Sequence, residues 1–333
     1  MGTTYSSRII GTGSYLPSRV VDNAELAYRF NRTASEMFRV TGIHSRRWAT
    51  PDTPCSQLAE EAATQAMVSA GLTMTDIDAL IVSTTSPDTI FPSTACHLQH
   101  RLNAKRVAAF DVAASCSGFL YGLSMADAFI RSGQFRRCLV VAAEIKSRYV
   151  TTDHGDSAML FGDGAGAVVV ARDHHQTGHQ EGIVKIRLHA DGFYQNLITI
   201  PAGGSRTPLS QHSIQNQQHT IQLQGGALFR VAVKRLSASI QELLQESHLQ
   251  IKDIKQVITH QANGRMLAAI AKRLGLPPEH MVSVIEQYGN TSSASLPIAL
   301  DHAYRQEAFG PGDLIVLGTF GGGLTWGTAL IRW

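Results

Sequence analysis

The chain has 333 residues, and its 29 Lys and Arg residues nearly balance its 26 Asp and Glu residues, for a formal net charge of +3. This balance does not indicate a nucleic-acid-binding surface, and a hydrophobic share of 44% with 17% charged residues is typical of a compact globule. No apolar run approaches the roughly 20 residues that span a bilayer, and the chain does not begin with a signal-peptide pattern. We therefore expect a cytoplasmic protein that binds neither nucleic acid nor a membrane.

Short apolar strand patterns alternate with helical patterns along the chain. The predicted strands are Val107–Ala114, Leu139–Ala143, Ala165–Ala171, Gln256–His260, Asp313–Leu317 and Trp326–Ile331. The predicted helices, with apolar residues three or four apart, are Ser56–Gly71, Phe119–Ser132, Gly226–His248, Gly264–Leu274 and Ser295–Tyr304. The alternation predicts an α/β fold with mostly buried sheets. The segment Ala202–Gln222, rich in Gly, Ser, Gln and His, predicts a surface excursion.

Three segments of the first half recur in the same order in the second half. The pairs are Leu72–Val82 with Leu249–Thr259, Cys138–Ala142 with Asp313–Leu317, and Gly164–Val170 with Trp326–Ile331. A repeat of this kind predicts two related halves, residues 1–173 and 174–333. Two such halves would stack as five layers, α/β/α/β/α.

The four cysteines, Cys55, Cys96, Cys116 and Cys138, lie far apart, and none forms a CxxC pair. Disulfide, metal and redox pairing are therefore not expected. Cys116 differs from the others because it lies between a predicted strand and a predicted helix. The free N–H groups of a helix N-terminus favour a thiolate, the nucleophilic form of cysteine. Ser117 and Gly118 are small, which would let a substrate approach the sulfur; the alternative is a buried structural cysteine.

Two polar residues of the second half are candidates to share a pocket with Cys116. His260 ends a predicted strand, and Asn290 lies in a small polar turn before a predicted helix. The repeat places Asn290 beside the equivalent of Cys116, so the two loops would meet at the same end of the sheets. Each alone could instead be an ordinary loop or core residue. Gly321–Gly323 could bring a backbone N–H donor close to a thioester oxygen, or could be a flexible turn.

Taken together, these residues resemble the β-ketoacyl-acyl-carrier-protein synthase III family, condensing enzymes of the thiolase-like fold. The matching segments run in family order over almost the whole chain: Gly11–Pro17, Thr41–Ile43, Phe91–Cys96, Ala114–Phe119, Leu160–Ala167, His260–Asn263, Gly289–Ser292 and Gly321–Gly327. The combination is specific, although no single segment is. Gly11-x-Gly13 alone means little, because Leu16 stands where a dinucleotide fingerprint has its third glycine.

The resemblance implies a two-step reaction on acyl thioesters. Cys116 would take an acyl group from acyl-CoA or acyl-carrier protein, with the oxyanion held by the backbone N–H groups of Cys116 and Gly322. His260 and Asn290 would then bind malonyl-acyl carrier protein and stabilise the enolate left by loss of CO₂. The product would be a β-ketoacyl-carrier protein that initiates fatty-acid synthesis. The resemblance implies neither a metal nor another cofactor.

The resemblance also implies two kinds of partner. Arg230, Arg265, Lys272 and Arg273 match positions where the family presents a basic patch to the acyl carrier protein, although each could simply be a solvated helix residue. Phe91 matches a residue that closes the acyl tunnel of the neighbouring subunit. We therefore expect a homodimer.

The sequence departs from the family where acetyl-CoA is held. Glu36, Val40 and Gly155 stand near the positions of a Trp and two Arg residues that hold CoA. The departure suggests a longer or carrier-bound acyl donor, as in a secondary-metabolism relative.

Three kinds of enzyme and one non-catalytic protein are alternatives to this interpretation. Thiolases use a second late cysteine, but none follows Cys138, and chain-elongating enzymes use a second His where Asn290 stands. A papain-type hydrolase shares the order Cys, His, Asn, but not the sequence around the cysteine. A non-catalytic scaffold on this fold is the remaining alternative.

Overall fold

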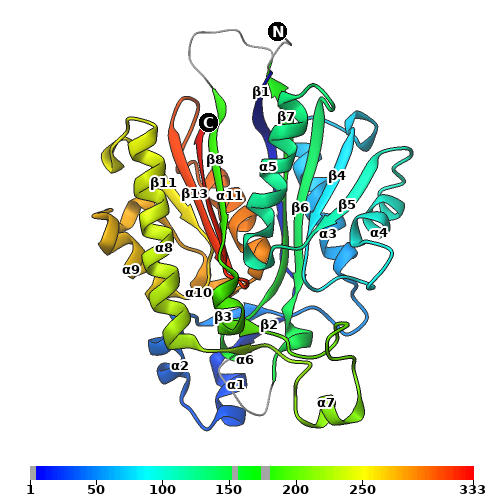
Figure 1. Ribbon diagram of the computed structural model, residues 1–333, viewed down its shortest axis with the longest axis vertical. Coiled ribbons are helices and arrows are strands. Elements are labelled where there is room, and N and C mark those ends of the chain that lie inside the picture. The colour runs from blue at the N-terminus through cyan, green and yellow to red at the C-terminus, as the bar shows by residue number, and fades with distance from the viewer. Residues whose placement is uncertain (1–4, 152–156, 174–180) are drawn as a thin grey trace.

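Two five-stranded sheets form the centre of the computed structural model, which describes residues 5–151, 157–173 and 181–333 (Figure 1). The first sheet has the order β1 (Ser6–Tyr15), β7 (Asp163–Asp173), β6 (Arg137–Ile145), β4 (Ala79–Ser83), β5 (Ala108–Val112). The second has the order β8 (Gly182–Ala190), β14 (Thr325–Arg332), β13 (Leu314–Gly321), β11 (Gln256–Thr259), β12 (Met281–Val282).

The two sheets have the same topology. In each sheet, the second strand named is antiparallel to both of its neighbours, the first and the third. The third, fourth and fifth strands are parallel to one another. The strands of the first sheet precede residue 174, and those of the second follow it. The predicted duplication is thereby confirmed, while the boundary between residues 173 and 174 stays a prediction.

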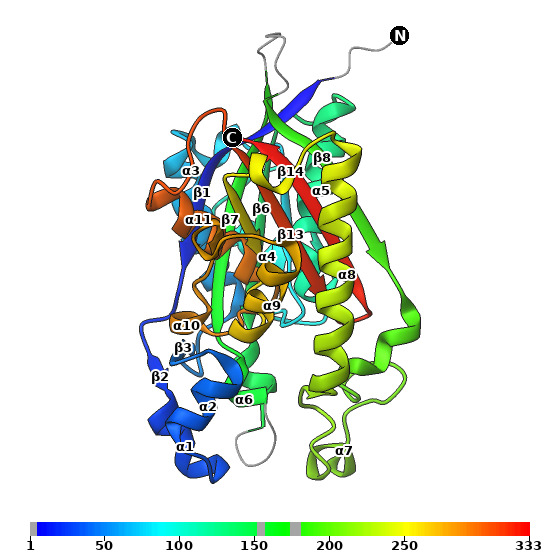
Figure 2. The ribbon, with the colours of Figure 1, turned by 90° about the vertical axis from the view of Figure 1, so that its left-hand side faces the viewer.

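Helices form the other three layers. Between the sheets lie α5 (Gly118–Arg131) and α11 (Ser295–Arg305), both of which contact both sheets. The outer face of the first sheet is covered by α3 (Cys55–Ser69) and α4 (Thr94–Arg101), and that of the second by α8 (Gly225–Glu246) and α9 (Gly264–Leu274) (Figures 1 and 2). The predicted α/β/α/β/α layering is confirmed.

The middle layer is buried because both of its helices are apolar on more than one side. Along α5, Phe119, Leu120, Leu123 and Ile130 are fully buried. In α11, the run from Ser295 to Asp301 is buried throughout. A helix that contacts a sheet on each side cannot have a broad polar face, and this packing fixes the N-terminal ends of both helices.

The glycines of β1 allow α3 to pack closely. A Cβ atom added at Gly11 would overlap the carbonyl oxygen of Ala66, and one at Gly13 would overlap that of Ala62. Gly11 and Gly13 therefore serve contact between a helix and a strand, which agrees with the absence of a dinucleotide fingerprint.

Several small elements, which the sequence patterns did not predict, lie at the end of the molecule away from the chain termini (Figures 1 and 2). They are β2 (Val20–Asp22), α1 (Asn23–Phe30), α2 (Ala34–Thr41), β3 (Ser45–Arg47), α6 (Ser157–Leu160), β9 (Ile198–Thr199), α7 (Gln211–Gln215), β10 (Gln222–Leu223) and α10 (Ile285–Tyr288). The expected surface excursion, Ala202–Gln222, contains α7. Across the described residues, no helix is both long and apolar enough to cross a membrane.

Candidate active site

Cys116 lies at a strand-to-helix turn, as predicted. The chain leaves β5, passes through a short 3-10 turn (Ser115–Ser117) and enters α5 at Gly118. Ser115 holds a left-handed backbone with φ of 50°. The Cys116 side chain is only 6% exposed, so its sulfur faces the interior of the molecule at the start of the buried helix.

Ser117 and Gly118, the small residues after Cys116, pack against neighbouring strands. A Cβ atom at Gly118 would overlap the Ser83 hydroxyl, and the Ser117 hydroxyl donates to the carbonyl oxygen of Thr325 at 3.1 Å. Both residues therefore serve packing of the turn against β4 and β14. The prediction that they open a path to the sulfur stays a prediction.

His260 directly follows β11 and is buried. Its Nδ1 lies 2.6 Å from the Ser295 hydroxyl, which also accepts the backbone N–H of Gln261 at 3.1 Å. Because that N–H occupies a lone pair of the hydroxyl oxygen, the hydroxyl proton is free to point at Nδ1 and leave the ring proton on Nε2. Burial lowers the pKa of His260 to about 3, so the ring is neutral at physiological pH.

The side chain of Asn290 is oriented by the loop around it. Its Oδ1 accepts the backbone N–H of Ser292 at 2.8 Å, and its Nδ2 donates to the carbonyl oxygen of Ala262 at 3.4 Å. Its backbone pairs with Leu160 and Gly162. One Nδ2 proton remains for another acceptor.

Cys116, His260 and Asn290 line one cavity of about 100 Å³, together with Gly321 and Gly322. The remaining wall is mostly apolar, from α6, β9, β10, α8, α9 and β13. The structure therefore brings together the three candidate residues from the two halves of the chain.

A second cavity, of about 180 Å³, also contains Cys116 in its wall. Phe161 and Ile198 line both cavities, so the cysteine lies where the two meet. This second cavity has a polar side formed by Thr85, Ser115, Lys146 and Ser292.

The glycine turn packs directly against the nucleophile turn. A Cβ atom at Gly321 would lie 2.7 Å from the backbone nitrogen of Cys116 and 3.0 Å from that of Ser117. The Thr319 hydroxyl donates to the carbonyl oxygen of Cys116 at 3.0 Å. A side chain at position 321 is therefore excluded, and the Gly322 backbone lines the cavity beside Cys116.

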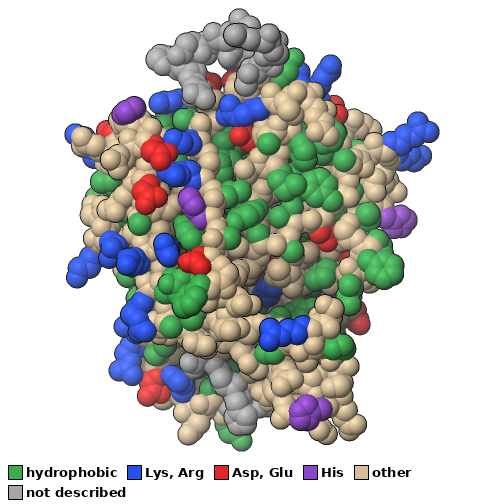
Figure 3. Space-filling model, in the orientation of Figure 1, with side chains coloured by type: hydrophobic (Ala, Val, Ile, Leu, Met, Phe, Trp, Pro, Cys, Tyr) green, Lys and Arg blue, Asp and Glu red, His purple; other side chains and the backbone are tan. Residues whose placement is uncertain are grey.

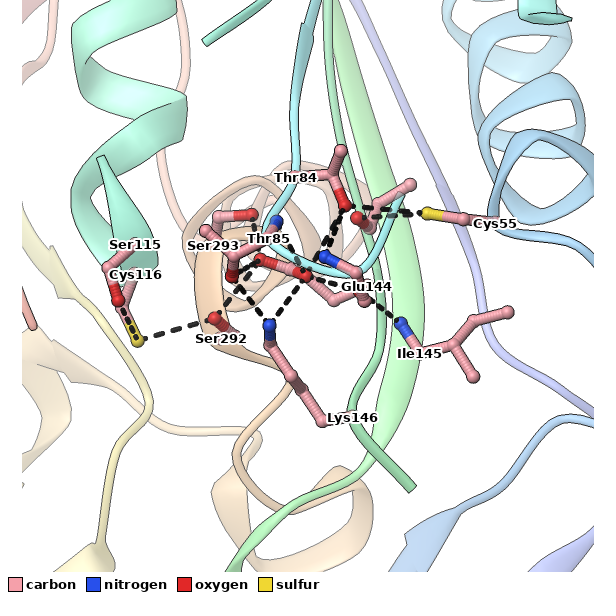
Figure 4. A network of polar contacts seen from close by, with 12 residues as sticks. Cys55, Thr84, Thr85, Ser115, Cys116, Glu144, Ile145, Lys146, Ser292 and Ser293 are labelled. Atoms are coloured by element: carbon pink, nitrogen blue, oxygen red, sulfur yellow. Dashed lines mark hydrogen bonds and ion pairs between the residues drawn. The ribbon is translucent and has the colours of Figure 1, made fainter. Parts of the chain in front are cut away.

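Sequence reasoning missed a buried polar network beside Cys116 (Figure 4). The Cys116 sulfur lies 3.3 Å from the Ser292 hydroxyl, which donates to Glu144 Oε1 at 3.1 Å. Lys146 Nζ lies 3.0 Å from Glu144 Oε2. Both charged residues are at the carboxyl end of β6, so two charges directly after an apolar strand were the signal that could have revealed them.

The network affects the charge of its members. Burial alone would raise the pKa of Glu144, but Lys146 and several hydroxyl donors outweigh it and hold that pKa below its ordinary value. Burial raises the pKa of the Cys116 thiol, against the opposing influence of Ser292 and Lys146. The expectation of a resting thiolate at the helix start is therefore wrong, because loss of hydration outweighs stabilisation of the anion.

The four predicted carrier-binding residues are all exposed on the outer helices. Arg230 lies on α8 directly after Leu228 and Phe229, which line the first cavity, and Arg265 lies on α9 beside Met266, which also lines it. The other two, Lys272 and Arg273, lie in the last turn of α9. Figure 3 shows Lys and Arg side chains along the left-hand side of the molecule, where Figure 1 places α8 and α9.

Phe91 lies in neither cavity and is 85% exposed, next to the equally exposed Ile90. Glu36 is exposed on α2, where hydrogen bonds from Thr33 lower the pKa of its carboxyl group. The carbonyl oxygen of Val40 accepts a hydrogen bond at 3.2 Å from Asn263, a residue of the first cavity. Helix α2 therefore lies beside that cavity, while Gly155 falls outside the described residues.

Comparison with known proteins identifies the family. Residues 110–192 match the family 3-oxoacyl-[acyl-carrier-protein (ACP)] synthase III, and residues 244–333 match its C-terminal part. The chain is 43% identical over 327 residues to the β-ketoacyl-[acyl-carrier-protein] synthase III of Methylococcus capsulatus, covering 98% of this chain and 99% of that one. It is 45% identical over 329 residues to the protein of that name from Alkalilimnicola ehrlichii, with the same coverage.

Solved structures show the same likeness. The 3-oxoacyl-[acyl-carrier-protein] synthase III of Aquifex aeolicus superposes with a TM-score of 0.89 at 38% identity, covering 98% of this chain and all of that one. The priming β-ketosynthase of the R1128 polyketide pathway superposes with a TM-score of 0.90 at 31% identity, covering 99% and 97%. The chain therefore belongs to the β-ketoacyl-acyl-carrier-protein synthase III family of condensing acyltransferases, which have the thiolase-like fold.

Proposed function

We propose that this chain catalyses the priming condensation for which its relatives are named. An acyl group is transferred to Cys116, and the acyl-enzyme then condenses with malonyl-acyl carrier protein. The observation that carries this proposal is the single cavity lined by Cys116, His260 and Asn290. Sulfur, imidazole and carboxamide groups from both halves of the chain meet there.

In the first step, Cys116 Sγ attacks the carbonyl carbon of an acyl thioester. The carbonyl oxygen becomes negatively charged and is held by the backbone N–H groups of Cys116 and Gly322. The close packing of the glycine turn on the cysteine turn supports this role. Collapse of the intermediate releases the thiol of the donor and leaves an acyl thioester on Cys116.

In the second step, His260 and Asn290 bind the thioester oxygen of malonyl-acyl carrier protein. His260 Nε2–H and the free Nδ2 proton of Asn290 donate to it, and a neutral imidazole suits this task. Loss of CO₂ leaves an enolate whose charge these hydrogen bonds stabilise. The enolate carbon attacks the acyl-Cys116 carbonyl and expels the thiolate, which gives the β-ketoacyl-carrier protein.

The acyl donor is proposed to differ from acetyl-CoA. Glu36 carries a negative charge on α2 beside the cavity, where CoA phosphates would be repelled. Taking about 30 Å³ for a group the size of a water molecule, the 180 Å³ cavity has room for about six such groups. We infer a longer acyl-CoA or a carrier-bound acyl group. The likeness to a priming β-ketosynthase of polyketide synthesis supports a role in secondary metabolism as the second candidate.

We propose that the acidic acyl carrier protein binds four exposed basic residues on α8 and α9. Arg230 and Arg265 are adjacent in sequence to residues of the cavity wall, and Lys272 and Arg273 lie further along α9. Exposed Ile90 and Phe91 are proposed to pack against a second subunit in a homodimer. A cytoplasmic location suits the four free cysteines.

The test is a measurement of intact mass after incubation with acetyl-CoA, longer acyl-CoA and acyl-carrier protein, followed by addition of malonyl-acyl carrier protein. The Cys116→Ala variant should gain no acyl mass. The His260→Ala and Asn290→Ala variants should load the acyl group but release CO₂ about 10²–10³-fold more slowly. Normal condensation by both of these variants would refute the assigned roles, and a clear preference for acetyl-CoA would refute the donor assignment.

A further inference from the structure

The 180 Å³ cavity beside Cys116 has a charged group in its wall. Lys146 lines this cavity, and its side chain is only 5% exposed. The apolar part of the same wall is formed by Phe161, Ile198, Ile200 and Ile221. Apolar side chains are sufficient to surround a plain alkyl chain, and a buried ammonium group adds nothing to that task. Nothing in the reaction described above uses Lys146.

Lys146 has one more hydrogen-bond donor than its partners use. An ammonium group has three N–H donors. One faces Glu144 Oε2 at 3.0 Å, and another is donated to the Thr85 hydroxyl at 2.6 Å. The centre of the Tyr149 ring lies 5.8 Å from Nζ, near the outer limit of a cation–π contact, and does not replace a hydrogen-bond acceptor. Among the described residues Nζ has no third acceptor, so one N–H remains for a group that enters the cavity.

The polar neighbours of Lys146 already have partners within the cluster. The Thr85 hydroxyl donates to Glu144 Oε1 at 3.3 Å, and the Ser292 hydroxyl donates to the same oxygen at 3.1 Å. Ser292 also lies 3.3 Å from the Cys116 sulfur. Figure 4 shows Ser292 and Lys146 both linked to Glu144, with Ser292 on the side of Cys116. The spare donor and the sulfur that would carry the acyl group therefore share one cavity and one network.

The charge of the cluster determines which kind of acceptor fits. The positive charge of Lys146 is already balanced by the ionised carboxylate of Glu144, whose charged atom lies 3.0 Å away. A carboxylate on the acyl group would add a buried anion without a counter-ion, which is costly. A plain alkyl chain would cover the spare N–H and give it no acceptor. A hydroxyl or keto oxygen accepts this N–H and leaves the net charge unchanged.

We propose that the acyl group transferred to Cys116 carries an uncharged oxygen, a hydroxyl or a keto group, which accepts a hydrogen bond from Lys146. Glu144 and Thr85 position the ammonium group, and the apolar part of the wall surrounds the carbon chain. Lys146 is therefore a specificity-determining residue for the acyl donor. This inference rests on the proposed function and names the class of substrate for its first step, in which the bonds that form and break are unchanged.

The test compares rates of acyl loading from pantetheine thioesters, followed by the intact mass of the full chain. Two pairs of donors differ only in a hydroxyl that replaces a methyl group of similar size: 3-hydroxybutyryl with 3-methylbutyryl, and 4-hydroxybutyryl with pentanoyl. In at least one pair, the hydroxylated donor should load about ten- to a hundredfold faster, the range expected for a hydrogen bond to a charged group. Succinyl, which carries a carboxylate, should load more slowly than any of the four.

Variants at Lys146 show whether its N–H causes the preference. Lys146→Met keeps a side chain of similar length without a donor, and it should load both members of each pair at similar rates. The double variant Glu144→Gln, Lys146→Met should do the same without leaving a buried carboxylate unbalanced, which keeps the test decisive if the single variant is unstable. Ser293→Ala is the matched control, because Ser293 donates to Glu144 at 2.8 Å but lies outside the cavity wall. This variant should keep the wild-type preference.

Three results would overturn the proposal: equal loading within both pairs by the wild type, a preference that persists without Lys146, or fastest loading by succinyl. Loss of the preference in Ser293→Ala would also overturn it, because general disturbance of the cluster would then explain the effect. Loading without any preference would leave the acyl transfer of the proposed function intact. Failure of every donor to load would instead refute that function and this inference together.

Discussion

Replacing Lys146 by Met should leave Glu144 buried without its counter-ion. The two side chains are 5% and 0% exposed, and their charged atoms lie 3.0 Å apart. Removing one partner of a buried pair typically costs about 3–5 kcal/mol. Glu144 keeps the hydroxyl donors Ser86, Ser292 and Ser293, so we expect a loss near the lower end, about 3 kcal/mol at pH 8.

The pH dependence of this loss follows from the pKa of Glu144. In the wild type that pKa is below its ordinary value of 4.5, so the carboxylate contributes stability above pH 4.5 that is lost as pH falls through the lower folded value. In Lys146→Met, burial is expected to dominate and to raise the pKa above 4.5. The sign then reverses, because the variant is penalised more as pH rises above 4.5. The deficit should therefore be larger at pH 8 than at pH 5.

Urea unfolding at both pH values, followed by tryptophan fluorescence, measures this deficit. The control is the double variant Glu144→Gln, Lys146→Met, which should recover most of the lost free energy, because replacing both partners is often close to neutral. An unchanged unfolding midpoint in Lys146→Met at both pH values would refute the reasoning. So would a larger deficit at pH 5 than at pH 8.

Four further outcomes follow from the cavity and the residues around it. His260→Ala or Asn290→Ala should slow condensation about 10²–10³-fold without slowing acyl loading, as separate product and intact-mass measurements would show. Because the pKa of His260 is about 3, wild-type malonyl decarboxylation should show no loss of rate near pH 6.5 as pH falls. Arg265→Glu should raise KM for malonyl-acyl carrier protein but not for an acyl-CoA donor, with a weaker dependence on salt. Gly321→Ala should slow acyl loading, since its Cβ would lie 2.7 Å from the backbone nitrogen of Cys116.

Each outcome has a result that contradicts it. Equal slowing of loading and condensation in the His260 variant would indicate general damage rather than a lost donor. A decarboxylation rate that falls near pH 6.5 would mean that the imidazole titrates in the ordinary range. An unchanged KM for the carrier substrate would remove Arg265 from the docking surface, and normal loading by Gly321→Ala would show that the turn can move.

The sequence allowed prediction of the layers and of the meeting of Cys116, His260 and Asn290. Each of these residues follows or precedes a clear apolar element, and the repeat related the two halves. Because the two halves have the same order of strands and helices, the loops that carry these three residues are expected at the same end of the sheets. Local pattern and topology therefore determine this part of the site.

The Glu144–Lys146 pair was not predictable from the same patterns. Two charged residues directly after an apolar strand can be exposed to solvent or buried, and the sequence does not distinguish these cases. The turn at Ser292, which comes from the other half of the chain, packs over them and buries them. The state of the Cys116 thiol was mispredicted for the same reason, because the helix start is visible in sequence and burial is not. The packing role of Gly118 was likewise not predictable, because it depends on a close contact with Ser83, which lies far away in the sequence.

The turn that holds Cys116 has a counterpart in the second half. Ser115 and Ser292 both adopt a left-handed backbone, with φ of 50° and 53°, and both begin a 3-10 turn that leads into a helix of the middle layer. Ser293 thus occupies the place of the cysteine. The same bend therefore has two uses, because it holds the cysteine sulfur in the first half and hydroxyl groups that contact Glu144 in the second. The chemistry belongs to the paired bends and to neither half alone.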